Sequence, residues 1–293
     1  MAKYLGIVLS SLFLFLVTGT NAVFWDDLRV TWGPGPAIGF FSRLPRVVTT
    51  AVEQGWVDAG STSCENDGLF SGFRYKLRNE NEIAVLFDKN GIIAGVQVLL
   101  PKQEILSPNN TFRYDLVPMY QNETFNGIDF FVLTAYFVPP ASICTTGRTL
   151  FDLMTEGTGT GLWFQNGASP NNQIDVPLTR PEAAEVGWTN CECFPGMGLH
   201  NFFEVETWAE TDCNTIQPTQ ATFNLAGEMT GFVLQSSGRV SSTRFESPPN
   251  EALYAIIGVD RVPQCLIDNN NAAGTSTMHF YFVDEPWLLA CSA

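Results

Sequence analysis

Basic residues and histidines are scarce in this chain of 293 residues. It has 15 Lys and Arg against 30 Asp and Glu, which gives a formal charge of −15, and it has only two histidines. Proteins that bind nucleic acid or anionic membrane surfaces present basic patches, so the charge disfavours both kinds of partner. No Gly-x-Ser-x-Gly elbow and no EF-hand loop occurs. We therefore expect neither a metal ion nor a cofactor.

Long apolar runs are missing after the first one. Residues 1–22 combine Lys3, an apolar stretch over 4–17 and small residues at a cleavage site, the pattern of a secretory signal peptide. The stretch is shorter than the ~20 apolar residues of a membrane helix, so we expect no membrane span. Two sequons, at Asn109 and Asn122, would then meet the glycosylation machinery. The sequence predicts a secreted, extracellular glycoprotein.

The chain contains two copies of one pattern, 43–144 and 180–293. Each copy opens on a short helix-like stretch that ends in Gly-Trp, Gly55-Trp56 in the first and Gly187-Trp188 in the second. Glycine takes the left-handed conformation that ends many helices, and a hydrophobic residue after it packs back on the helix. Both tryptophans are therefore predicted to be structural.

Strand-like runs follow each Gly-Trp. They lie at 73–77, 83–87, 92–100 and 130–138 in the first copy, and at 202–206, 221–225, 229–234 and 277–283 in the second. Alternating apolar residues and β-branched content predict strands, and proline stops the last run of each copy. We predict an α+β, β-rich fold of two tandem pseudo-repeats, each a short helix followed by about four antiparallel strands. Each sheet could close over a cavity, or the two units could pack face to face.

Two segments lie outside the copies. An N-terminal segment, 23–42, precedes the first, and a Gly-rich connector, 145–179, joins the two. The glycines over 157–167 match neither a P-loop nor a dinucleotide-binding fingerprint. A mobile or hairpin-forming connector is favoured over a phosphate site.

Seven cysteines in an exported chain favour disulfides. Cys64 and Cys144 bracket the first copy as Cys193 and Cys291 bracket the second, so we predict these two disulfides. Closing a loop of about 80 residues contributes about 4.5 kcal/mol in the chain-entropy description.

Three further cysteines, Cys191, Cys213 and Cys265, belong to the second copy alone. Cys191 is an alternative to Cys193 in its pair. Because the total is odd, one cysteine is left over and could link the chain to a partner.

Candidate functional residues are few. His200 follows Cys193 by seven residues, and His279 lies in an alternating apolar run. With Trp163 of the connector, the two histidines are our candidate ligand-binding residues. A nucleophile could use either histidine as its base, and pairs of acids could act as in glycosidases, but no recognisable constellation occurs. We therefore predict no catalytic residue.

Three segments, 27–33, 157–167 and 193–200, resemble those of a family of secreted invertebrate proteins of similar length. That family has no established activity. The resemblance implies export and a common fold, and it implies no catalytic residue.

Three hypotheses on function remain. The first is a non-enzymatic binding protein whose two units form a site for a small apolar ligand or an extracellular protein. The second is a secreted hydrolase that uses acidic residues or a histidine near 193–200. The third is an extracellular matrix or secretion component, cross-linked through the odd cysteine. A large apolar cavity favours the first hypothesis over the others.

Overall fold

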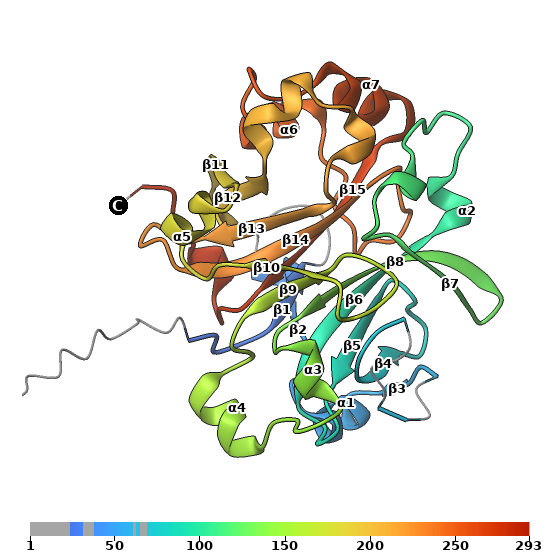
Figure 1. The fold of residues 1–293 in the computed structure, drawn as a ribbon, viewed down its shortest axis with the longest axis vertical. Helices are drawn as coiled ribbons and strands as arrows, with labels where there is room; N and C mark the ends of the chain where they lie inside the picture. The colour runs from blue at the N-terminus through green and yellow to red at the C-terminus, as the bar shows by residue number, and fades with distance from the viewer. Residues whose placement is uncertain (1–23, 32–37, 61–62, 65–68, 293) are drawn as a thin grey trace, which may run out of the picture.

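The computed structural model describes residues 24–31, 38–60, 63–64 and 69–292, so the predicted signal peptide lies outside the described residues. The chain forms two antiparallel sheets (Figure 1). Sheet one has the order β10-β9-β8-β6-β5-β4-β3, and β7 also pairs with β8. Sheet two has the order β11-β12-β13-β14-β15-β1-β2. The predicted α+β, strand-rich fold is confirmed.

The strands of sheet one are β3 (Trp56–Asp58), β4 (Phe73–Leu77), β5 (Ile83–Phe87), β6 (Ile93–Pro101), β7 (Gln121–Phe125), β8 (Ile128–Tyr136), β9 (Leu162–Gln165) and β10 (Gln173–Val176). The strands of sheet two are β1 (Arg29–Thr31), β2 (Phe41–Arg43), β11 (Trp188–Phe194), β12 (Gly198–Phe203), β13 (Thr219–Phe223), β14 (Met229–Ser237) and β15 (Thr275–Tyr281).

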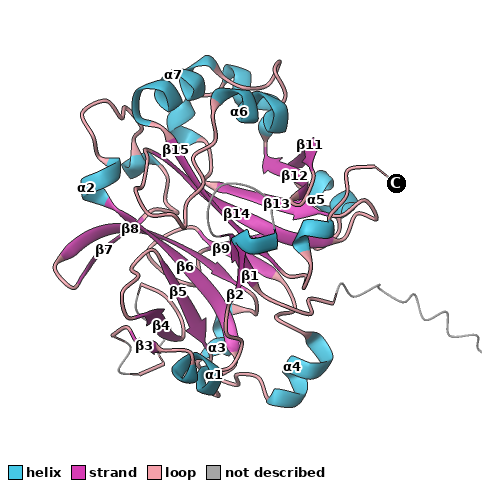
Figure 2. Cartoon of the chain, turned by 180° about the vertical axis from the view of Figure 1, so that it is seen from behind, coloured by secondary structure: helices cyan, strands magenta, loops and turns pink. Residues whose placement is uncertain are grey.

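The α-helices are α1 (Val48–Glu53), α2 (Lys102–Ile105), α3 (Pro140–Ile143), α4 (Leu150–Glu156), α5 (Arg180–Glu185), α6 (Asn250–Ile257) and α7 (Gln264–Ala273). The 3-10 helices are η1 (Ile38–Phe40), η2 (Tyr114–Leu116), η3 (Val205–Glu210), η4 (Cys213–Thr215) and η5 (Pro286–Leu288). Figure 2 shows the helices at the periphery of the two sheets.

Both helix-to-strand passages are built alike, as the Gly-Trp pattern predicts. Gly55 follows α1 with φ +86°, and Gly187 follows α5 with φ +96°, conformations that glycine adopts without strain. Trp56 and Trp188 come next, at the start of β3 and β11, and are 4% and 0% exposed. These two strands raise the count above the expected four, because the tryptophans open a strand of their own.

The two hairpins that precede the units are exchanged between the sheets. The N-terminal hairpin β1–β2 pairs with β15 of the second unit, at Arg29↔Tyr281. The connector hairpin β9–β10 pairs with β8 of the first unit, at Trp163↔Tyr136. Each sheet is therefore completed by a hairpin that stands directly before the other unit's helix in the sequence.

The glycines of the connector serve a close backbone approach. Gly157 forms a parallel bridge with Trp25, and a Cβ added there would lie 2.2 Å from the Trp25 carbonyl oxygen. A Cβ on Gly159 would lie 2.2 Å from the carbonyl oxygen of Phe137. A residue with a side chain cannot occupy either position. Close backbone packing therefore accounts for these glycines, and no phosphate site is needed to explain them.

The core lies between the two sheets. One buried cluster includes side chains from both, and its aromatic rings interlock across the interface. Phe137 of the first unit lies 5.2 Å from Phe282 and 5.9 Å from Phe232 of the second, measured between ring centroids. Trp25 stacks on Phe282 at 3.7 Å. Of the two arrangements left open above, the structure therefore has face-to-face packing.

Three disulfides are present. Cys64 is bonded to Cys144 and Cys193 to Cys291, as the duplication predicts, with Cα atoms 5.2 and 5.5 Å apart. A third bond, Cys213–Cys265, joins η4 to α7. The side chain of Cys191 lies outside the described part of the structure. Among the described residues, no helix is long and apolar enough to cross a membrane.

Candidate functional site

A pocket of about 250 Å³ lies on the outer face of sheet two, beneath α6 and α7. Figure 1 shows these helices on the side of β13–β15 that faces away from sheet one. The pocket is lined by Phe112, Tyr120, Phe194, Met197, His200, Phe202, Cys213, Ile216, Pro218, Gln220, Gln235, Ser236, Ser237, Glu246, Ser247, Pro248, Pro249, Ala252, Leu253, Ile256, Ile257, Leu266, Asn269, Thr275, Thr277 and His279. Its walls are mostly apolar and aromatic, as is typical of small-molecule sites.

The two histidines meet at the floor of this pocket. His200 lies on β12 and His279 on β15, and their Nε2 atoms are 3.4 Å apart. Two strands, β13 and β14, separate them in the sheet, so the rings meet above those strands. Gly231 of β14, which has no side chain, lies in the row of His200, and Val233 of the same strand lies opposite His279. The sheet order thus brings together two candidates that are 79 residues apart in the sequence.

Glu246 completes the polar floor. Its backbone forms a bridge with Thr277 of β15. Its Oε2 lies 2.9 Å from Nδ1 of His279 and accepts a hydrogen bond from the Thr277 hydroxyl at 3.3 Å. No local pattern distinguishes Glu246 in the sequence, because it lies in an irregular segment and is one of 30 acidic residues.

Burial governs the charge of His200 in the floor and of Tyr281 in the same strand as His279. Desolvation lowers the pKa of His200 to about 3, and the neighbouring His279 acts in the same direction, while backbone hydrogen bonds to Gly198 and Glu192 oppose the shift. Burial, helped by the Glu246 carboxylate, raises the pKa of Tyr281 well above its ordinary value. At neutral pH His200 and Tyr281 are therefore uncharged.

The roof of the pocket comes from elements that the sequence analysis did not identify. Helix α6 contributes Leu253 and Ile257, and the Cys213–Cys265 disulfide fastens η4 to α7 beside them. Pro249 and Pro263 each lie directly before a helix, and Glu251 lies in the first turn of α6, but these start signals are weak. Phe112 and Tyr120 reach over from the first unit. The pocket is thus built mainly by the second unit, while the space between the two sheets is filled by the core.

Trp163, the third candidate, lies elsewhere. It is on β9 of sheet one, half-buried against a cluster that includes Tyr136 and the Cys64–Cys144 disulfide. A Cβ on Gly161 would lie within 2.3 Å of its ring, so the indole packs on bare backbone. Trp163 does not line the pocket.

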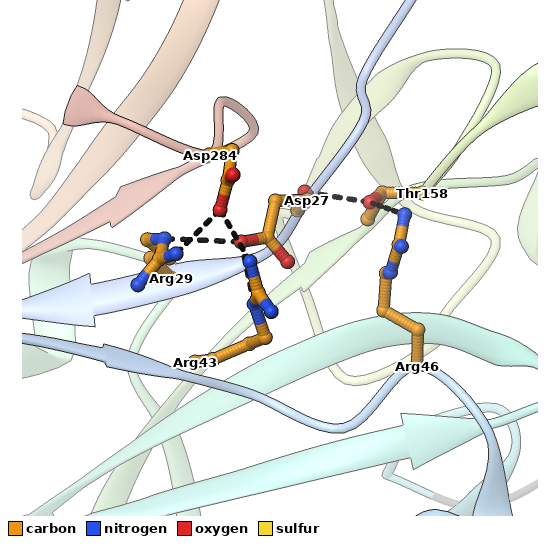
Figure 3. Close-up of polar contacts among 6 residues, drawn as sticks. All are labelled: Asp27, Arg29, Arg43, Arg46, Thr158 and Asp284. Carbon is orange, nitrogen blue, oxygen red and sulfur yellow. Dashed lines mark hydrogen bonds and ion pairs between the residues drawn. The ribbon is translucent and has the colours of Figure 1, made fainter.

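A second polar cluster joins the N-terminal hairpin to the end of β15 (Figure 3). Asp27 is within 3.0 Å of Arg29 and 2.8 Å of Arg43, and both arginines also pair with Asp284. The hydrogen bond from Arg29 contributes most to lowering the pKa of Asp284 to about 2, whereas burial raises the pKa of Asp27. Both acids are already neutralised by arginines, so this cluster is a clamp for the exchanged hairpin.

In the part of the chain that the structure describes, no group of three or more His, Cys, Asp and Glu side chains is arranged to hold a metal ion. No family model matches the chain, and no curated protein or solved structure matches it. The resemblance to secreted invertebrate proteins therefore stays a prediction.

Proposed function

We propose that the chain is an extracellular binding protein that holds a small apolar ligand in the pocket beneath α6 and α7. The observation that carries this proposal is a cavity of about 250 Å³ with apolar walls and a buried polar floor of His200, His279 and Glu246. Small-molecule sites have this composition, because apolar contacts supply affinity and a few polar groups orient the ligand. The volume fits a ligand somewhat smaller than most drug molecules, whose sites measure roughly 300–1,000 Å³.

The geometry of the histidines favours binding over hydrolysis. Glu246 beside Nδ1 of His279 resembles the acid–histidine half of a catalytic triad, in which Nε2 faces a nucleophile. Here Nε2 of His279 faces the ring nitrogen of His200 at 3.4 Å. A pKa of about 3 also makes His200 a weak base at neutral pH. The pair therefore suits hydrogen bonding to a ligand better than proton transfer.

Export and glycosylation belong to the same proposal. The sequon residues Asn109 and Asn122 are both exposed. Three disulfides are typical of proteins that fold in an oxidising compartment. These features support a secreted glycoprotein.

A pocket-filling variant tests the function. Ala252 on α6 lines the pocket, whereas Ala255 on the same helix is exposed and does not line it. We expect 2-naphthol, a small neutral fluorophore, to bind the wild-type protein and Ala255→Phe alike. Ala252→Phe should weaken its binding at least ~tenfold, because the new ring occupies the cavity.

Titration by fluorescence, with thermal melting to show that both variants are folded, provides the readout. Mass spectrometry of small molecules that accompany the protein from its native secretion would identify the ligand class. If 2-naphthol does not bind, or binds Ala252→Phe as well as Ala255→Phe, the pocket is not a binding site for apolar molecules.

A further inference from the structure

The pocket contains one carboxylate, and within the described part of the chain no Lys or Arg side chain lines the pocket to pair with it. Glu246 is the only Asp, Glu, Lys or Arg among the described residues that line it. Its side chain is 12% exposed. Oε2 faces His279 and Thr277, while Oε1 is buried and has no hydrogen-bond partner within the described structure. A largely buried carboxylate with an unpaired oxygen is costly unless a positive charge lies beside it.

The first unit shows how the same scaffold satisfies such a carboxylate. Strand pairing aligns the row Arg74–Leu86–Gly95–Tyr136 in sheet one with the row His200–Thr222–Gly231–Tyr281 in sheet two. The two rows occupy equivalent places in their units and share the glycine and the tyrosine. His200 therefore stands where the first unit has Arg74.

Arg74 is bound tightly by an acid. Its Nη1 and Nη2 donate to the two oxygens of Glu123 at 2.8 and 2.6 Å. The Glu123 side chain is 12% exposed, the same fraction as that of Glu246. Phe70 and Phe125 lie against the guanidinium, with ring centroids 4.6 and 5.1 Å from its central carbon. The outer face of the first unit thus encloses a cation between a carboxylate and aromatic rings.

The carboxylates of the two units arrive in a similar way. Glu123 lies on β7, which pairs with β8, the last strand of the first unit. Glu246 bridges Thr277 on β15, the last strand of the second unit. In both units the chain folds back beside the last strand and places an acid over the outer face. The second unit also has an acid beside its last strand, at the place that matches Gln121 of the first unit. It has histidine in place of the arginine, and a cavity lined by aromatic rings that include Phe112 and Phe202.

We propose that the ligand of this pocket is a small organic cation, an ammonium group on an apolar body, whose charge pairs with the Glu246 carboxylate at the pocket wall. This inference rests on the proposed binding function and names its ligand class. The ammonium would pair with the carboxylate as the Arg74 guanidinium pairs with Glu123 in the first unit. The apolar body would fill the cavity below α6. A ligand that carries a carboxylate is disfavoured, because it would bring a second negative charge beside Glu246.

Two probes of nearly equal size test the ligand class. 2-Phenylethylamine is a cation at neutral pH, and 2-phenylethanol is its neutral counterpart. Isothermal titration calorimetry in about 0.15 M salt, which screens the general charge of the protein, should show the amine to bind at least ~tenfold more tightly than the alcohol. Glu246→Gln should abolish this preference and leave the affinity for the alcohol within about twofold of wild type.

Glu251→Gln is the matched control, since Glu251 is an exposed acid on α6 that does not line the pocket. It should keep the wild-type preference. Equal binding of the two probes by the wild-type protein, or a preference that survives in Glu246→Gln, overturns the inference while the pocket itself still binds. The wild-type comparison alone decides the matter should Glu246→Gln fail to fold. If neither probe binds, the proposed function fails with it.

Discussion

The outer faces of the two units share the same strand register and differ in the side chains that cover them. In the first unit, Arg74 and Glu123 form a buried pair with two hydrogen bonds, and Gln97 donates to Thr134 beside them. In the second unit, the positions of Arg74 and Thr134 hold His200 and His279, and a cavity opens beside them. One face is closed by its own side chains, whereas the other is available to a ligand.

Under the proposed function, this difference assigns stability to one part of the duplicated scaffold and binding to another. The inner faces of both sheets are buried in a common core, so a change there disturbs both units. The outer faces lie on opposite sides of this core, so one can hold a cavity, although Phe112 and Tyr120 of the first unit also line that cavity. Four predictions test this comparison.

The two equivalent disulfides should contribute alike. They close loops with sequence separations of 80 and 98 residues, and loop-closure entropy depends only weakly on length. We expect Cys64→Ala/Cys144→Ala and Cys193→Ala/Cys291→Ala each to lower the free energy of unfolding by about 4.5 kcal/mol. Urea denaturation of both double variants measures this. A loss in one variant less than half that in the other contradicts the equivalence of the units.

Removing Arg74, the partner of Glu123 in the first unit, should lower the free energy of unfolding much more than removing the Glu246 charge in the second. Arg74→Met leaves Glu123 buried without a counter-charge, which should cost about 3 kcal/mol of unfolding free energy. Glu246→Gln removes a carboxylate that no described Lys or Arg of the pocket pairs with, and should cost less than about 1 kcal/mol. Chemical denaturation compares the two, with Arg74→Met/Glu123→Leu as a control that should recover part of the loss. Similar losses from the two single variants would refute the distinction between the faces.

Lowering the pH should reduce the free energy of unfolding through His200 of the second unit. The pKa of this histidine is 6.5 in a model compound and about 3 in the fold, so the unfolded chain takes up its proton first. Stability from this group is present above pH 6.5 and is lost as the pH falls from 6.5 toward 3. The free energy of unfolding should drop by about 1.5 kcal/mol between pH 6.5 and pH 5 on this account.

Denaturation curves across that pH window, recorded for the wild type and His200→Gln, isolate the histidine from carboxylates common to both proteins. The variant should show the smaller pH dependence. Identical slopes would mean that His200 is not held neutral by its surroundings.

Glycosylation should distinguish the units without affecting their stability. Both sequons lie in the first unit, and the second has none. Asn109→Gln and Asn122→Gln, expressed in secreting cells, should each remove one glycan from the mass of the protein. Because both residues are exposed, each change should alter the unfolding free energy by less than about 0.5 kcal/mol. An unchanged mass in either variant would show that its sequon is not used.

Much of the framework could be predicted from short patterns. The Gly-Trp endings predicted where α1 and α5 stop, because only the residues next to a helix end determine its cap. The matching positions of Cys64 and Cys193, and of Cys144 and Cys291, predicted two disulfides. Helices α6 and α7 were missed. The apolar run Ala252–Ile257 of α6 is too short to separate a helix from a strand by its pattern, and the middle of α7 is the polar run Asp268–Asn271.

Only part of the candidate site could be predicted from the sequence. His200 and His279 were identified as scarce residues with chemical capacity, but Trp163 packs on sheet one, away from them. Nothing local distinguishes Glu246 from the other acids. Its role depends on a bridge to Thr277, a contact between segments 31 residues apart.

The amino-acid sequence by itself determined that one helix-and-strand unit occurs twice and that equivalent disulfides close each occurrence, because these properties depend on local spacing. Only the tertiary structure decided that the hairpins are exchanged, that the sheets pack face to face, and that two distant histidines and one acid share a pocket. Those relations depend on strand order and on which faces are buried, and neither is encoded in the neighbourhood of any single residue.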